Sequence, residues 1–343
     1  VTMHQHGLFD IQQRHDRIKQ YATMLEQLNS IVDWEAFRPT LETIRKKQRK
    51  SNAGRKPFDV VFMFKILILQ SLYNLSDAQL EFQITDRFSF MAFLGLQLND
   101  PVPDEKTIWL FRDELTTAKL IDPLFEQFDR ALSSNGFAAE KGQIIDATIV
   151  SSPKQRNSRE ENKQIKEEGK TPESWDSKPN KKRQKDTNAR WTKKRNVSYF
   201  GYKNHVNVDA KHKFIRRFEV TSASVHDSQA VKNLLDEKNS SKEVYADSAY
   251  VGEEISNLLE ANDLHSCINE KGYRNRPLTE SQKESNREQS KIRSRVEHVF
   301  GVQSQREGSL LLRGIGIVRA KTKIGLRNLS YNLSRYALLK SSG

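Results

Sequence analysis

The first third of the chain has apolar residues at the spacing of helices. Residues 57–73 begin with Pro-Phe-Asp and continue as an apolar segment. Residues 76–79 read Ser-Asp-Ala-Gln, the form of a capping box at the start of a helix. Asp104 stands where it can cap a further helix over residues 105–116. The pattern predicts an all-α domain over residues 1–136.

The last of these predicted helices carries polar and basic side chains. Short helices joined by tight turns, with such a helix at the end, are compatible with a helix-turn-helix that reads the major groove of DNA. A small helical bundle that makes no contact with DNA would show the same pattern, so both interpretations stay open. The side chains concerned are Lys106, Thr107, Trp109 and Arg112.

The apolar spacing changes after residue 136. Short runs rich in Ile, Val and Thr replace the helical pattern, and further helical patterns alternate with them. Two adjacent antiparallel strands followed by alternating strands and helices indicate an α/β or α+β domain around a mixed sheet, which we predict over residues 137–343. The predicted strands are residues 143–150, 202–208, 214–221 and 243–245, and the predicted helices are residues 227–237, 252–262, 280–303 and 319–339.

Residues 151–197 interrupt this second domain. The segment has few large apolar residues and is dominated by Lys, Arg, Asn, Gln and Glu. A segment of that composition is not expected to bury a core of its own. We therefore predict a basic insertion that is partly disordered and becomes ordered on its binding partner.

The positive charge of the chain is concentrated in two segments. Its 57 Lys and Arg against 44 Asp and Glu give a net charge of +13. Residues 154–195 hold 15 basic residues against 7 acidic ones, and residues 287–340 hold 12 against 3. Such clusters suit surfaces that neutralise phosphates, so the expected partner is a nucleic acid, although a merely solvated surface has the same composition.

Other features restrict the class of protein. The single cysteine, Cys267, excludes an internal disulfide and fits a reducing compartment. The most apolar window, residues 60–69, is too short for a membrane span and contains Lys65. The N-terminus does not show the pattern of a signal peptide. We expect a cytoplasmic protein with no membrane partner.

Two aspartates occupy positions that need an explanation. Asp146 lies inside a run too apolar for an edge strand, so a partner must neutralise its charge or its carboxylate must face a cation. Asp247 follows a short strand and precedes a turn into a helix, which is where open α/β sheets bind ligands. The structural alternatives are an ion pair with an arginine for Asp146 and a helix cap for Asp247.

Glu297 is the third carboxylate of interest. It lies at the border of an apolar stripe that predicts an amphipathic helix packed on the sheet, with Arg293 one turn earlier on the same side. Arg before Glu is the weaker order for a helical ion pair, so a simple salt bridge explains Glu297 less well. The stripe consists of Ile292, Val296, Val299 and Phe300.

These three carboxylates supply hard oxygen ligands with no His or Cys cluster among them. Such a set suits Mg²⁺ and not zinc. Two Mg²⁺ ions about 4 Å apart can activate an attacking oxygen and stabilise a leaving one during displacement at a phosphodiester. A basic surface would then bind the DNA, and the acidic site would bind the metal ions.

The motifs around these residues resemble those of DDE transposases from bacterial insertion sequences of the four and five superfamily. IDATIV carries Asp146, YADSAYVG carries Asp247 and RSRVEHVFG carries Glu297, at spacings of 101 and 50 residues. The segments ARWTKK, YFGYKNHV, SVHDSQ and EKGYRNRPLT also resemble the catalytic domain of that family. GRKPFDVVFMFKILILQSLYNLSD and VPDEKTIWLFRDEL resemble its N-terminal domain.

The resemblance implies a ribonuclease-H-like catalytic domain preceded by an all-α domain for DNA binding or dimerisation. It implies that Asp146, Asp247 and Glu297 ligate two Mg²⁺ or Mn²⁺ ions, cleave DNA at transposon ends and join the freed 3′-hydroxyl to target DNA. The implied partners are the terminal inverted repeats and the target DNA. They would be bound by a homodimer or a larger oligomer at the nucleoid of a bacterium.

The family signature around the glutamate is incomplete in this chain. It consists of Tyr, Arg, Glu and Lys; Arg293 and Glu297 match it, whereas Ser290 and Ser304 occupy the Tyr and Lys positions. Arg306 or Lys291 could replace the missing grip on the DNA end. The departure keeps open a catalytically inactive DNA-binding relative that occupies or represses transposon ends, and also a plain Mg²⁺-dependent nuclease.

The remaining candidates concern contact with DNA. Trp191 stands among cations, a combination suited to stacking on an unpaired or distorted base, although it could instead anchor the insertion to the core. Asp227 follows a predicted strand and either lies near the acidic site or caps the next helix. The predicted DNA-binding residues are Arg190, Trp191, Lys193, Lys194, Arg293 and Arg306.

Overall fold

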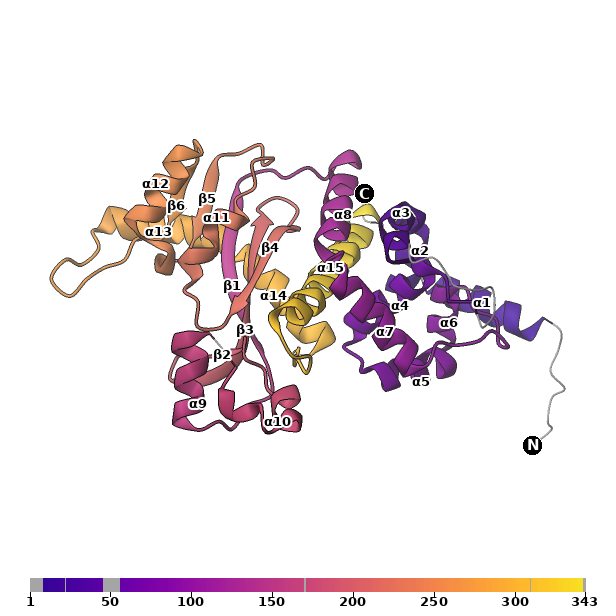
Figure 1. Ribbon diagram of the computed structural model, residues 1–343. Helices are drawn as coiled ribbons and strands as arrows, with labels where there is room; N and C mark the ends of the chain where they lie inside the picture. The colour runs from indigo at the N-terminus through magenta and orange to yellow at the C-terminus, as the bar shows by residue number, and fades with distance from the viewer. Residues whose placement is uncertain (1–8, 22, 46–55, 170, 309, 342–343) are drawn as a thin grey trace, which may run out of the picture. The chain divides into compact units, whose positions relative to one another are not determined.

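The computed structural model describes the chain apart from residues 1–8, 22, 46–55, 170, 309 and 342–343 (Figure 1). It divides into two compact units. The first comprises residues up to Gln127 together with those from Leu329 onward, and the second comprises Phe128–Asn328. The predicted domain boundary at residue 136 stays a prediction, and most of the N-terminal segment considered for a signal peptide lies outside the described residues.

The first unit is helical throughout its described part. Its central helix, α4 (Val60–Tyr73), begins at Asp59, whose carboxylate accepts hydrogen bonds from the amides of Val61 and Phe62. The predicted capping box is present at the start of α5 (Asp77–Asp86). The other helices are α1 (Asp10–Gln20), α2 (Met24–Ile31), η1 (Glu35–Phe37), α3 (Arg38–Leu41), η2 (Glu42–Arg45), α6 (Phe88–Leu94), α7 (Glu105–Thr117) and α8 (Ile121–Ser134), the last of which continues into the second unit.

The helix considered as a DNA reader, α7, is capped by Asp104 as predicted. Arg112 on this helix is not available to DNA, because its guanidinium forms an ion pair with Asp77 at 2.6 Å and also donates to Gln70 Oε1 at 2.8 Å. Trp109 is 44% exposed and Lys106 is exposed. The interpretation of α7 as a reader therefore depends on Lys106, Trp109 and the partly exposed Thr107, and it stays a prediction.

Helices long and apolar enough to cross a membrane were sought in the described part of the chain. No single helix there has the required length and hydropathy, and α4 and α5 meet the criterion only as a pair bent by 103°.

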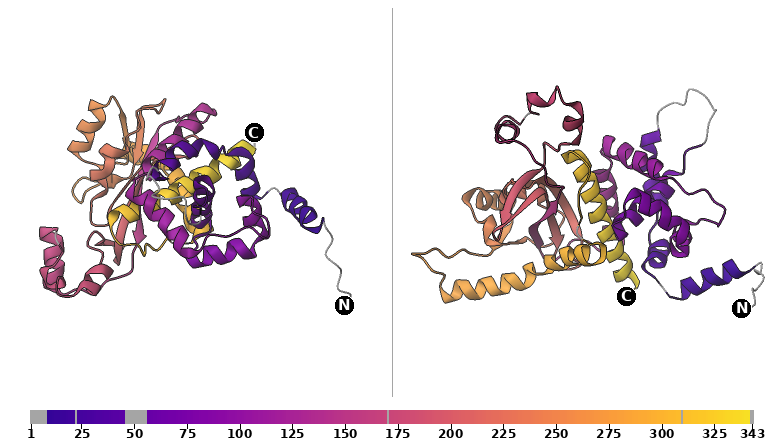
Figure 2. Two further views of the ribbon diagram at one scale, coloured as in Figure 1. Left: turned by 45° about the vertical axis from the view of Figure 1, so that its right-hand side comes forward. Right: turned by 90° about the horizontal axis from the view of Figure 1, so that it is seen from below.

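The second unit is built on a mixed sheet of six strands (Figures 1 and 2). Strands β1, β3 and β4 are antiparallel neighbours, β5 and β6 run parallel to β1, and β2 pairs with the first part of β3. Three antiparallel strands followed by two parallel ones form the ribonuclease-H-like sheet, so the predicted fold class is confirmed. The strands are β1 (Gln143–Ser151), β2 (Arg190–Lys194), β3 (Val197–Asp209), β4 (Ile215–Ser222), β5 (Glu243–Ala246) and β6 (His265–Ile268).

The central strand β1 is covered on both faces, which explains its apolar sequence. On one face Ile145 packs in a cluster with residues of α11 (Val231–Leu234) and α12 (Glu253–Ala261). On the other face Val150 packs with residues of α15 (Ile317–Ser341), and α14 (Arg295–Glu307) lies against the strand. Because successive strand residues face opposite sides, Asp146 faces the side of α14 and α15.

Two helix predictions in the second unit need correction, and two strands were missed. The helix predicted over residues 280–303 is two helices, α13 (Glu280–Arg293) and α14, which meet at Ser294. The helix predicted over 227–237 is only η5 (Asp227–Ala230) followed by α11. Strands β2 and β6 were not predicted. The residues of β2 fall in the segment predicted as a partly disordered insertion, and the four residues of β6 carry no clear periodicity, so that both strands depend on pairing with β3 and β5.

The insertion after β1 folds around a small core of its own, contrary to the prediction. Trp175 is fully buried, and its indole N–H donates to Glu161 Oε1 at 2.6 Å, while Lys181 pairs with the same carboxylate. One tryptophan with polar anchors supplies a core that the low apolar content did not indicate. The elements are α9 (Arg159–Lys163), the π-helical turn η3 (Gln164–Glu168), η4 (Glu173–Trp175), α10 (Pro179–Gln184) and then β2.

Candidate active site

Asp146 and Asp247 lie at the same level on neighbouring strands. Strands β1 and β5 are parallel and pair Gln143 with Val244 and Ile144 with Tyr245. Continuing this register by two residues sets Asp146 beside Asp247, and adjacent strands are only about 5 Å apart. Asp247 immediately follows β5 and caps the turn η6 (Ser248–Tyr250), where its Oδ1 accepts from the amide of Ala249 at 2.8 Å.

The negative charge at this place is only partly compensated. Burial raises the pKa of Asp146 to about 6, and the negative charge of Asp247 acts in the same direction. The amide of Ala147, which donates to Asp146 Oδ1 at 2.7 Å, and the charges of Arg293 and Lys194 act in the opposite direction without cancelling the effect. Because their negative charge is not fully balanced, the two adjacent carboxylates would attract a further cation.

Arg293 connects Glu297 to this pair of aspartates. Its Nη1 lies 3.6 Å from Asp146 Oδ2, and its Nη2 lies 3.8 Å from Glu297 Oε1. Both distances exceed the roughly 2.7–2.9 Å of a charge-assisted hydrogen bond, so the contacts are loose. The Glu297 side chain is 68% exposed in the first turn of α14. One guanidinium thus faces two of the three predicted carboxylates, and the third lies beside Asp146.

The three carboxylates do not form a complete metal centre in this structure. Among the described residues, no three side chains of His, Cys, Asp or Glu are grouped closely enough to hold a metal ion together. The donors themselves fit a hard divalent cation, since Asp146 and Asp247 present carboxylate oxygens side by side with excess negative charge. Glu297 is directed toward Arg293 and solvent.

A fourth carboxylate, Asp227, also belongs to these surroundings. Lys203 Nζ lies 2.8 Å from Asp227 Oδ1, and His205 Nδ1 lies 3.8 Å from the same oxygen. Burial lowers the pKa of His205 to about 4, so this ring is neutral at pH 7 and Lys203 is the cation that balances Asp227. Of the two roles considered for Asp227 from sequence, the helix cap is wrong, because His226 is the N-cap of η5. The position near the acidic site is supported, since Asp227 acts electrostatically on Tyr250 together with Asp146 and Asp247.

Tyr250 is a buried neighbour of the acidic residues that the sequence did not single out. It is 1% exposed, and its hydroxyl has no hydrogen-bond partner among the described residues. Burial raises its pKa, and the negative charges of Asp227, Asp146 and Asp247 act in the same direction. The only advance signal was a tyrosine three residues after Asp247 in a turn, which is too common a feature to identify it.

The predicted DNA-binding residues of the insertion differ in their surroundings. Trp191 is 45% exposed with its ring 5.3 Å from that of Phe200, so it both anchors β2 and presents a face to solvent. Lys193 and Lys194 are exposed, and Lys194 is close enough to influence the carboxyl of Asp146. Arg190 instead holds the insertion together, because it donates to the carbonyls of Ile165, Ala189 and Thr187.

Ser290 and Ser304, which occupy the Tyr and Lys positions of the family signature, both form hydrogen bonds within the protein. Ser290 Oγ accepts a hydrogen bond from Asn269 Nδ2 at 2.9 Å, and Ser304 Oγ donates to the carbonyl of Phe300 at 2.9 Å. Lys291 is exposed on α13. The side chain of Arg306 lies outside the described residues, so its predicted role stays a prediction.

Replacing Asp146 by Asn is expected to stabilise the protein at neutral pH in EDTA. Because its folded-state pKa of about 6 exceeds the unfolded value, ionisation costs folding free energy. This loss is absent below pH 4, develops between pH 4 and 6, and is complete above pH 6. We expect Asp146→Asn to raise the free energy of unfolding by about 3 kcal/mol at pH 7.5 and by almost nothing at pH 4, as measured by urea titration. An equal effect at both pH values would contradict this reasoning.

Comparisons with known proteins agree with this geometry. Residues 138–333 match the family described as Transposase DDE domain, and residues 12–114 match the family described as Transposase domain (DUF772). The larger match defines the class of protein as an enzyme that breaks and joins DNA strands. The first match covers more than half of the chain, so the protein belongs to the DDE transposase family, whose members act on DNA and use divalent metal ions.

A solved structure with partial similarity is the cryo-EM structure of the piggyBac transposase synaptic complex with hairpin DNA. It is 12% identical in sequence and superposes with a TM-score of 0.45, covering 93% of this chain and 75% of that one. A similarity of this degree is too low to support an argument about fold or function.

Proposed function

We propose that the second unit cleaves DNA at transposon ends and transfers the freed 3′-hydroxyl into target DNA, with Asp146, Asp247 and Glu297 as its metal-binding residues. The observation that supports this most is the juxtaposition of Asp146 and Asp247 on parallel strands with incompletely balanced charge. A purely structural pair of carboxylates would be neutralised by short ion pairs, whereas the nearest arginine contact here is 3.6 Å long.

The carboxylates have separate tasks in this proposal. Asp146 and Asp247 are held by the sheet and would provide the fixed oxygens for Mg²⁺ or Mn²⁺. Glu297 is exposed and loosely paired, so it can turn toward them at little cost. Two bound ions would supply activation of the attacking oxygen and stabilisation of the leaving oxygen. Arg293, freed from its loose contacts, is placed to face a phosphate of the DNA.

Basic side chains next to the acidic site support DNA as the substrate. Lys193, Lys194 and the exposed face of Trp191 lie on β2, and Lys194 acts electrostatically on Asp146. They would neutralise phosphates of the transposon end and the target duplex. We further propose that the protein acts as a homodimer or larger oligomer, because two transposon ends must be joined in one reaction.

The proposal is tested with the full chain and duplexes that carry the ends of its own element, in Mg²⁺ or Mn²⁺. We expect strand cleavage at the ends and, with added target DNA, joined products on a denaturing gel. Cleavage without joined strands would identify a nuclease instead. Binding without cleavage would favour the inactive relative, which is supported by the serines at positions 290 and 304, where the family signature has Tyr and Lys.

A further inference from the structure

The loop after β6 is a tight, projecting turn with no role in the site described above. It carries the motif EKGYRNRPLT over residues 270–279. Tyr273 and Arg276 exchange backbone hydrogen bonds, with N to O distances of 3.0 Å and 3.1 Å, so that Arg274 and Asn275 form its tip. A two-residue turn of this kind presents its side chains in a defined direction.

The base of the loop is fixed near the acidic site. Asn286 of α13 accepts from the amide of Glu270 at 2.8 Å and donates to its carbonyl at 3.0 Å. The backbone amide of Asn269 donates to the carbonyl of Ala246 at 3.2 Å. Ala246 is the last residue of β5, and Asp247 follows it directly. The loop is therefore held between α13, which leads to Arg293, and the strand end that carries Asp247.

The side chains of the loop have the composition of a surface for nucleic acid. Tyr273 is 61% exposed, with Lys271 Nζ 5.9 Å from the centre of its ring. Lys271, Arg274 and Arg276 are exposed and form no ion pair with any residue that the structure describes, and residues 271–278 contain no acidic residue. Unpaired cations around an exposed aromatic ring suit phosphates on either side of a stacked base.

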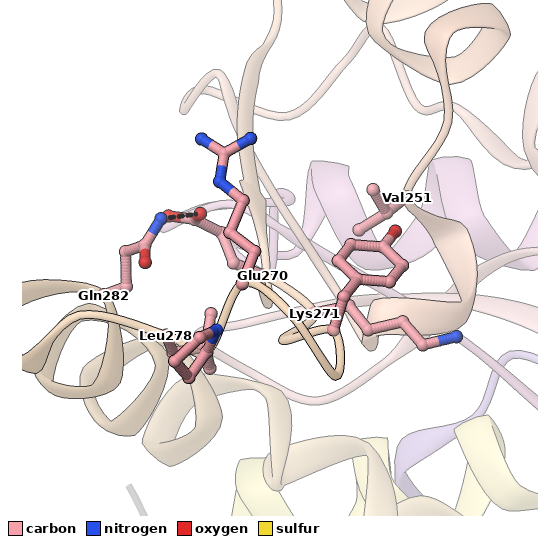
Figure 3. A pocket seen from close by; sticks show the side chains of 8 residues that line it. Val251, Glu270, Lys271, Leu278 and Gln282 are labelled. Atoms are coloured by element: carbon pink, nitrogen blue, oxygen red, sulfur yellow. Dashed lines mark hydrogen bonds between the residues drawn. The ribbon is translucent and has the colours of Figure 1, made fainter.

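A pocket of about 210 Å³ lies under this loop (Figure 3). A cavity of roughly 150 Å³ can hold benzene, so the space here suits about one planar ring system. Val251, four residues after Asp247, and Leu278 supply apolar walls, and Tyr273 supplies an aromatic one. One wall of the pocket is thus only four residues from Asp247 in the sequence.

One polar side of the pocket carries a carboxylate, which does not suit a phosphate. Gln282 Nε2 donates to Glu270 Oε2 at 2.5 Å, and Figure 3 shows this pair together on one side, with the amino group of Lys271 directed away from it. A carboxylate repels a phosphate but accepts hydrogen bonds from the exocyclic amino groups of bases. The cations Lys271 and Arg276 of the lining suit phosphates, and the Glu270 carboxylate together with the apolar and aromatic walls suits a base.

We propose that loop 271–278 and its pocket bind one unpaired base of the DNA strand next to the phosphate that is cleaved. A base inside a duplex does not expose its ring faces, so only an unpaired base could enter. Tyr273 stacks on the base, and the loop cations neutralise the phosphates beside it. The inference rests on the proposed function, since it requires DNA to lie at Asp247.

The experiment compares two DNA probes with the full chain in EDTA, so that binding is measured without cleavage. One is a short duplex with a single unpaired 2-aminopurine, and the other is the same duplex fully paired. The parent protein is expected to bind the first more tightly and to quench its fluorescence. Tyr273→Ala should weaken binding of the unpaired probe by about 5- to 150-fold, the range of base–aromatic stacking, and leave the paired probe unchanged.

Two control variants separate stacking from charge. Tyr273→Phe retains an aromatic ring and should bind both probes like the parent. Arg274→Ala removes a cation at the tip of the turn and should weaken both probes equally, with a smaller salt dependence. Equal weakening of both probes by Tyr273→Ala, or a loss in Tyr273→Phe as large as in Tyr273→Ala, would overturn the base pocket.

The same proteins distinguish failure of this inference from failure of the proposed function. Asp146→Asn should keep the preference for the unpaired probe while losing Mg²⁺-dependent cleavage. A parent protein that cleaves transposon ends but shows no preference for the unpaired base refutes the pocket alone. A protein that has the preference but in which Asp146→Asn cleaves like the parent supports the pocket and refutes the catalytic assignment.

Discussion

Asp146→Asn, Asp247→Asn and Glu297→Gln are each expected to slow Mg²⁺-dependent DNA cleavage by at least about 1,000-fold. Each change removes a negatively charged oxygen while retaining the size of the side chain. Metal ions at a phosphodiester contribute several kcal/mol to transition-state stabilisation, and each 1.36 kcal/mol corresponds to a factor of ten in rate. Single-turnover cleavage of end-labelled transposon DNA measures the effect.

DNA binding serves as the companion measurement for these three variants. Their affinity for DNA in EDTA should equal or exceed that of the parent, because a negative charge near the phosphates has been removed. Glu284→Gln is a matched control, since this glutamate lies on α13 next to α14 and forms only an exposed pair with Arg287. It should cleave at the rate of the parent. Parent-like cleavage by the Asp146, Asp247 or Glu297 variant would remove that residue from the site.

Arg216→Met is expected to lower the free energy of unfolding by about 3–5 kcal/mol. The Arg216 side chain is 1% exposed, and its guanidinium lies 2.9 Å from Asp129 Oδ1 and 3.2 Å from Asp209 Oδ2. It also donates to the carbonyl of Phe137 at 2.6 Å. Methionine fills the aliphatic part of the space but leaves two buried carboxylates without their cation.

Chemical unfolding followed by far-ultraviolet circular dichroism measures this loss. Arg287→Met is the control, because its pair with Glu284 is exposed at 71% and 61% and exposed pairs contribute about 0–1 kcal/mol. If Arg216→Met and Arg287→Met unfold at the same denaturant concentration, the buried network has no special stabilising role. Asp209 also closes the turn between β3 and β4, accepting from the amides of His212 and Phe214. Strand β3 pairs with β1, the strand that carries Asp146.

Features that depend on near neighbours in the chain were predictable. The helix starts at Asp59, Ser76 and Asp104 follow from side chains that bond backbone amides two or three residues away. The centrality of β1 follows from its nearly continuous apolar run, because such a strand must be covered on both faces. The order Asp, Asp, Glu with its surrounding motifs was sufficient to indicate the family that the comparison then showed.

Charge partners were not predictable, because they depend on which elements pack together. Arg112 and Arg190 read as candidates for DNA, yet their guanidinium groups bond to Asp77 and to backbone carbonyls of the insertion. Arg293 read as a grip on DNA and faces two carboxylates. An ion pair between residues far apart in the chain produces no periodic pattern in the sequence. The sequence therefore does not show whether a given arginine or lysine is exposed or buried in an ion pair.

Asp146 and Asp247 show most directly which features the local sequence determines and which depend on the tertiary structure. That each aspartate ends or interrupts a strand is local information, carried by β-rich residues on either side of it. That Asp146 lies beside Asp247, 101 residues later, results from the parallel pairing of β1 with β5. The core around Trp175 and the buried hydroxyl of Tyr250 arise in the same way, from long-range packing that removes water from a group and thereby changes its chemistry.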